Sequence, residues 1–229
     1  MNTEIIVSPG DNGTHNTQPL YMFFGPAAEY EAVRITDENG IEDFLRLQYI
    51  GQIAAMANGT SHHVKPRTHD DLVKHLDAGM DIIGARHIPT GEHVGQALLT
   101  DPFSAAAKNM EGYPNLTMAK VVQSFYVRAD HRYKRLAPAV RDVSNPAGVI
   151  FAKAATLSAD GFTQELVAKI ASDNPGSLNT FAQNGFNRII AVGNDLVRGH
   201  AVKFVSAALP ATPIQAAIQG DRMGAPCLG

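Results

Sequence analysis

The sequence has little cysteine, little net charge and no long apolar run. Its 229 residues include one cysteine, Cys227, which excludes a framework of disulfides within one chain. The formal net charge of −3 provides no broad positive field of the kind that favours nucleic acid. No stretch approaches the roughly 20 apolar residues of a membrane span, and residues 1–13 lack the basic start and apolar stretch of a signal peptide. These absences predict a cytoplasmic protein without a nucleic-acid partner or a membrane span.

What is present is typical of a globular domain. Hydrophobic residues make up 45% of the chain and charged residues 18%, and the length fits one α/β domain. Residues 8–19 are turn formers, and the end of the chain from Pro210 is rich in alanine, proline and glycine. We therefore predict an N-terminal extension over 1–29, one folded domain over 30–207 and a C-terminal tail over 208–229.

Hydrophobic periodicity and turn formers divide that domain into strands and helices. Strands are predicted at 30–36, 81–88, 92–100, 117–127, 164–171, 188–192 and 200–207. Helices are predicted at 41–58, 68–78 and 175–183, together with a helical tract that runs to residue 160 and is broken at Pro146. The order combines an antiparallel meander with helical crossovers.

A basic segment follows the fourth predicted strand and leads into the third helical tract. A turn from a strand into a helix presents free backbone N–H groups, which suit a pyrophosphate. Arg132, Lys134 and Arg135 add positive charge there. The alternative is an ordinary solvated turn.

A second pattern follows the fifth predicted strand. Asn174 begins a turn, a short helix follows, and Gly185 and Phe186 end it. Asn174 suits either a helix cap or an amide contact with a ligand.

Together these segments resemble the GNAT superfamily of N-acetyltransferases. Val127, Arg132 and Ala137 match its acyl-CoA motif at the correct spacing. Asn174, Gly185 and Phe186 match its later motif, with Ser177 and Phe181 as near substitutes. The resemblance covers about residues 30–207. It implies an α/β (α+β) fold with a mixed, mostly antiparallel sheet of six or seven strands flanked by four helices.

The resemblance also implies an activity and a site. The activity is transfer of an acyl group, with acetyl favoured, from acyl-CoA to a small-molecule or protein amine that attacks directly. A backbone N–H near Tyr126 is expected to polarise the thioester carbonyl, and His62 and His63 are candidate bases in the loop after the first helix. The donor is assigned to Phe125, Val127, Arg132, Tyr133, Lys134, Arg135, Leu136, Ala137, Asn174, Ser177 and Phe181.

Three departures keep alternatives open. Arg135 replaces a motif glycine, Phe181 replaces a tyrosine that serves as general acid, and no acidic residue lies between Thr117 and Val127. A long segment between Ala137 and Asn174 is compatible with an acyl-carrier-protein phosphopantetheine donor, as in N-acyl amino acid or acyl-homoserine-lactone synthases. A non-catalytic binding module is a further alternative. No metal site is predicted, and a homodimer is left open.

Overall fold

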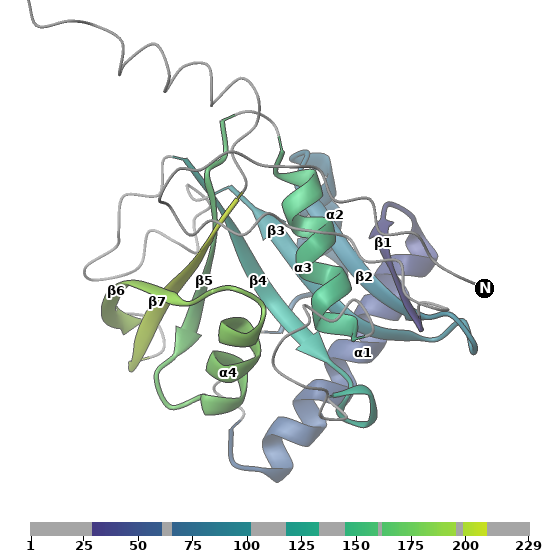
Figure 1. Ribbon diagram of the computed structural model, residues 1–229. Coiled ribbons are helices and arrows are strands. Elements are labelled where there is room, and N and C mark those ends of the chain that lie inside the picture. Colours follow the sequence, from purple (N-terminus) through teal and green to yellow (C-terminus); the bar gives the residue numbers. More distant parts are fainter. Residues whose placement is uncertain are drawn as a thin grey trace, which may run out of the picture.

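The sequence folds around one mixed sheet with helices on both sides. The computed structural model describes residues 29–60, 66–101, 118–132, 145–159, 162–195 and 199–209. These residues form seven strands and four α-helices (Figure 1), with a 3₁₀ turn, η2, after the fourth strand. In chain order they are β1 Tyr30–Ile35, α1 Glu38–Ala57, α2 His69–Asp77, β2 Asp81–His87, β3 His93–Thr100, β4 Ala119–Val127, η2 Ala129–His131, α3 Pro146–Leu157, β5 Glu165–Ala171, α4 Pro175–Gln183, β6 Arg188–Asp195 and β7 His200–Ala208.

The strands lie in the order β1-β2-β3-β4-β5-β7-β6. Every neighbouring pair is antiparallel except β4 and β5, which run parallel. Parallel neighbours need a crossover, and α3 provides it. The predicted mixed, mostly antiparallel sheet flanked by four helices is confirmed.

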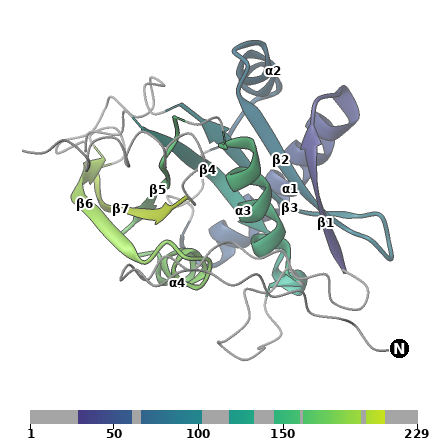
Figure 2. The ribbon, with the colours of Figure 1, turned by 45° about the horizontal axis from the view of Figure 1, so that its top comes forward.

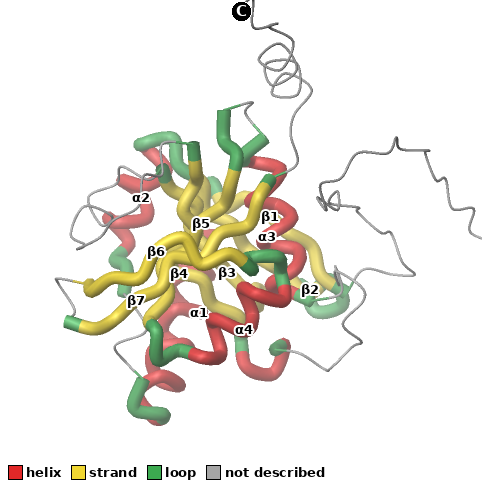
Figure 3. Tube along the Cα trace, turned by 60° about the vertical axis from the view of Figure 1, so that its left-hand side comes forward, coloured by secondary structure: helices red, strands yellow, loops and turns green. Residues whose placement is uncertain are grey.

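Two faces of the sheet carry separate sets of helices (Figure 3). On the α1 side, Phe44 of α1 and Leu72 of α2 pack against Ile82 and Leu98. On the α3 side, Ile150 and Phe151 of α3 pack against a larger cluster drawn from β1 to β5 and β7. Figure 2 shows α3 crossing the strands and α4 near the ends of β4 and β5. Within the residues that the structure describes, no helix has both the length and the apolarity to cross a membrane.

Local chemistry sets where these helices begin. Thr68 caps α2 in a capping box with Asp71, which follows it by three residues in the sequence. The predicted start of the first helix at Ile41 is too late, because Asp37 accepts from the Gly40 N–H and α1 begins at Glu38. The predicted interruption at Pro146 is confirmed as a helix boundary, since α3 begins there, and the part of the predicted tract before residue 145 lies outside the described residues. Asn145 accepts from the Gly148 N–H at 2.7 Å, and Pro146 opens α3, where its missing N–H has no intrahelical partner to lose.

Candidate functional site

Strands β4 and β5 separate towards their C-terminal ends. Their parallel pairing runs from Ala119↔Glu165 to Val122↔Ala168. Beyond it β4 continues to Val127 and β5 to Ala171, and Figure 1 shows the two strands diverging. We call this unpaired stretch the splay. From residue 123 onward, no strand among the described residues pairs with the β5-facing edge of β4, so that edge can offer backbone groups to a ligand.

A bulge in β4 lies at the start of the splay. Leu98 is opposite Gln123 but Gln96 is opposite Tyr126, so β4 holds one more residue than β3 between these pairs. Ser124 takes up the difference with φ of 48°, the only positive φ outside glycine among the described residues. Such strained backbone persists where surrounding contacts hold it, and bulges redirect nearby side chains.

The α1 side of the bulge is polar. Arg67, from the segment between α1 and α2, donates from Nε to Ser124 Oγ at 3.2 Å and from Nη2 to Gln123 Oε1 at 2.9 Å. Gln48 of α1 holds the backbone of Arg67 through two hydrogen bonds of 2.8 and 2.9 Å. The sequence marks residues 59–67 as polar and basic, but it gives no sign that Arg67 contacts β4.

Tyr126 lies on the same side, two residues further along. A Cβ added to Gly51 of α1 would be 2.8 Å from Tyr126 Cε2, so the helix and the ring are in close contact. The Arg132 guanidinium lies 5.0 Å from the centre of that ring. Arg132 also donates from Nε to the Val127 carbonyl at 2.6 Å. The predicted phosphate-binding arginine is therefore turned back onto the end of β4.

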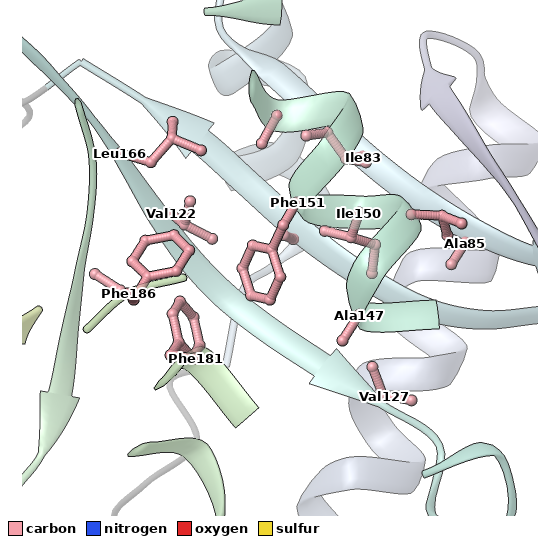
Figure 4. Packing of buried hydrophobic residues seen from close by; sticks show 14 of the residues in the cluster. Ile83, Ala85, Val122, Val127, Ala147, Ile150, Phe151, Leu166, Phe181 and Phe186 are labelled. Carbon is pink, nitrogen blue, oxygen red and sulfur yellow. The ribbon is translucent and has the colours of Figure 1, made fainter. Parts of the chain in front are cut away.

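The α3 side of the splay is aromatic. Phe125 stacks on Phe151 with ring centres 5.0 Å apart, and Phe181 meets both rings edge-on at 5.1 and 4.9 Å. Figure 4 shows Phe151, Phe181 and Phe186 pointing toward one another. Phe181 is 3% exposed. The predicted donor residues Phe125 and Phe181 are thus in contact with each other, as parts of the core.

Asn174 and Ser177 meet at the start of α4. Asn174 Oδ1 accepts from the Ser177 N–H at 3.0 Å, and Pro175 occupies the first turn. The capping interpretation of Asn174 is confirmed. A ligand contact by its amide stays a prediction.

A polar cluster at the far end of β4 has no counterpart in the sequence patterns. Arg128 donates to Glu92 at 3.0 Å and to Asp130 at 2.8 Å, and these bonds lower the pKa of both carboxyls. It also contacts His131 Nε2 at 2.8 Å. Tyr30 Oη is 2.9 Å from His131 Nδ1. The partners come from three separate segments, so no local pattern could show them.

The contacts of the cluster favour one neutral tautomer of His131. A guanidinium only donates, so Nε2 accepts and Nδ1 carries the proton that it donates to Tyr30. Burial, together with the Arg128 charge, lowers the pKa of His131, which favours this neutral form. Burial raises the pKa of Tyr30. These contacts hold η2, from which the chain continues to Arg132.

Several predicted residues lie outside the described ranges. They are His62, His63, Tyr133, Lys134, Arg135, Leu136 and Ala137. His69, the first residue of α2, is bonded to Glu38 of α1 at 2.6 Å. No group of three or more histidine, cysteine or acidic side chains in the described ranges could hold a metal ion.

Comparison with solved structures identifies the fold. No protein-family model matches the sequence, and no curated protein matches it. A Desulfovibrio desulfuricans protein assigned to the GNAT family of acetyltransferases matches with a TM-score of 0.53 and 11% identity, covering 79% of this chain and 99% of that one. The chain has the GNAT fold.

Two further structures show how widely GNAT-fold acceptors differ. The ribosomal-protein-alanine N-acetyltransferase of Brucella melitensis has a TM-score of 0.51, 17% identity, and coverage of 78% of this chain and 99% of that chain. The spermidine N-acetyltransferase of Vibrio cholerae, in complex with CoA and spermine, matches with a TM-score of 0.51 and 12% identity. The match covers 80% of this chain and 97% of that chain. A GNAT fold alone therefore does not name an acceptor.

Proposed function

We propose that this chain is an N-acyltransferase that moves an acyl group from acyl-CoA to an amine, with acetyl as the favoured acyl group. The observation that carries the proposal is the splay on a GNAT fold. Pairing between β4 and β5 stops at Val122↔Ala168 while both strands continue, and a bulge at Ser124 lies beside the gap.

The donor fits this edge chemically. The pantetheine arm contains two amide groups, and unpaired backbone of β4 from Gln123 to Val127 can pair with them as a further strand would. β5, the other strand of the splay, leads directly into the first turn of α4. Tyr133 to Ala137 stay the predicted site of the pyrophosphate.

The amine approaches from the α1 side. On the α3 side Phe125, Phe151 and Phe181 fill the space with packed rings, whereas the α1 side carries polar groups. An amine held there is close to the thioester before reaction, which lowers the entropic part of the barrier.

Transfer then needs no covalent enzyme intermediate. The neutral amine attacks the thioester carbonyl carbon, a C–N bond forms and the C–S bond breaks. The amine nitrogen releases a proton to solvent, and the departing CoA sulfur leaves as thiolate or takes a proton. A backbone N–H near Tyr126 is the proposed donor to the oxygen on which charge develops.

Thermal unfolding with ligands tests the donor site. The protein is heated alone and with millimolar CoA, acetyl-CoA or a long-chain acyl-CoA. A ligand that binds only the folded state, at about 100 times its Kd, stabilises by about 2.7 kcal/mol. We expect acetyl-CoA to raise the Tm, and the Arg132→Ala, Arg135→Ala double variant to reduce that rise.

A matched double variant, Arg46→Ala with Arg188→Ala, removes two exposed guanidinium groups from elsewhere on the surface and should keep the full shift. A shift with only the long-chain ligand would change the acyl group of the proposal. The absence of any shift would contradict acyl-CoA as donor and favour a carrier-protein donor or a non-catalytic module.

A further inference from the structure

Arg67 places a fixed positive charge beside the splay. Its guanidinium bonds to Ser124 and Gln123, the two residues of β4 at the bulge. Both lie directly after Val122, where pairing with β5 ends. The guanidinium therefore contacts the first two residues of the unpaired edge of β4, where the thioester is proposed to lie.

Residues of three elements, α1, β4 and β3, fix the backbone and the side chain of Arg67. The side-chain amide of Gln48, which is 9% exposed, binds both the N–H and the carbonyl of Arg67. On the other side, Gln123 Nε2 donates to Thr100 Oγ1 of β3 at 2.9 Å, which orients the amide oxygen toward the guanidinium. A side chain clamped in this way loses little further entropy when it binds a ligand.

A second guanidinium lies further along the same face. Arg132 stacks on Tyr126 and bonds to the Val127 carbonyl. The sequence of β4, Ala119–Val127, contains no aspartate or glutamate. Two cations thus flank Tyr126 along a strand that supplies no negative side chain. These two charges favour an anion over a polycation beside Tyr126.

We propose that the acceptor is an amine that also carries a carboxylate, as an amino acid does, and that Arg67 binds the carboxylate. This inference rests on the proposed function, since it names the acceptor class for the same site. Guanidinium and carboxylate match in geometry and form charge-assisted hydrogen bonds, which are stronger than neutral ones. The short link between the two groups of an amino acid keeps the amine near the bulge.

Matched acceptors test the inference. CoA release from acetyl-CoA is measured with a panel of L-amino acids, each beside its carboxamide, which keeps the side chain and the amine but removes the negative charge. For the wild-type protein we expect kcat/KM to be at least about tenfold higher for the amino acid, mostly through KM.

Variants then assign the preference to Arg67. Arg67→Met should remove most of it by raising KM for the amino acid while leaving the carboxamide nearly unchanged. Arg67→Lys should keep part of it. Arg46→Met, on the exposed part of α1, is the control and should keep the whole preference.

Several results would overturn the inference. One is equal turnover of amino acids and carboxamides by the wild-type protein, which needs no variant to fold. Another is a preference that survives Arg67→Met, with folding checked by Tm. If acetyl-CoA raises the Tm but no amino acid is acylated, the carboxylate inference is wrong while the donor proposal stands. If acetyl-CoA does not bind at all, the proposed function itself is contradicted.

Discussion

The two sides of β4 at the splay differ in almost every physical respect. On the α3 side, Phe125 joins three other phenylalanines in a packed cluster. On the α1 side, Gln123 and Ser124 bond to Arg67. The first side is a core that fixes the position of the strand. The second presents charge and hydrogen-bonding groups that core packing does not require, and it is the side on which we propose that ligands bind.

The bulge allows neighbouring residues of β4 to contact Arg67 on one side of the sheet and the aromatic cluster on the other. Regular alternation would place residues 123 and 125 on one face and 124 on the other. With the extra residue at Ser124, both Gln123 and Ser124 reach Arg67 while Phe125 and Val127 stay in the α3-side cluster. Changes on either side should therefore have different consequences.

The largest expected effect is on the aromatic side. Phe151→Ala removes the ring that contacts Phe125, Phe181 and Phe186, and should lower the free energy of unfolding by about 3–5 kcal/mol. Urea denaturation measures it. Phe162→Ala removes the same side chain where it is 79% exposed, and should change stability by less than about 1 kcal/mol. Equal losses would show that the cluster is not a core.

A smaller effect is expected where α1 meets the polar side. Alanine normally stabilises a helix relative to glycine, but at Gly51 its Cβ would collide with the Tyr126 ring. Gly51→Ala should therefore destabilise the protein by about 1–3 kcal/mol and lower acyltransfer activity. In α4, Gly176→Ala meets its nearest atom at 3.7 Å and should be neutral or stabilising. Stabilisation by Gly51→Ala would contradict the close contact of α1 with β4.

Variants of Asn174 distinguish its role as the cap of α4 from a role in binding the donor. Asn174→Ala should cost about 1 kcal/mol, because the Ser177 N–H loses its acceptor. Asn174→Asp keeps an acceptor at that position and should keep the stability. If Asn174→Asp retains the Tm but weakens the acetyl-CoA shift, the amide also contacts the donor. If both are retained, Asn174 is only a cap.

The smallest expected effect is a dependence on pH. Burial lowers the pKa of His75, His93 and His131 from the ordinary 6.5. The unfolded chain then binds protons before the folded one does, so stability is present above pH 6.5 and decreases as the pH falls below that value. Unfolding free energies measured between pH 5 and 8 should show this loss, and His93→Gln should reduce its slope. A flat profile would contradict the burial of these rings.

Local patterns predicted most of the fold. The strands and helices follow from apolar spacing, and caps such as Thr68 with Asp71 were readable because both partners are three residues apart. The boundary at Pro146 was also readable, because a proline cannot continue a helix but fits its first turn. The cap at Asn145 was not predicted.

The candidate site was only partly predictable for the same reason. The assignment of the donor to the end of the fourth strand and the cap at Asn174 each come from a pattern within one segment. The contact of Arg67 with Ser124 joins residues 57 positions apart, and that of Tyr30 with His131 joins residues 101 apart. Such pairs depend on how α1 packs against the sheet and on how β1 is placed within it, which no spacing in the sequence shows.

Hydrogen exchange with and without acetyl-CoA tests the central claim most directly. If the splay binds the donor, amides of residues 123–127 and of the first turn of α4 should exchange more slowly with ligand. Amides of β6, which lies at the far edge of the sheet, should be unaffected. If acetyl-CoA protects another part of the chain and leaves residues 123–127 unchanged, the splay is not the donor site and the account is wrong.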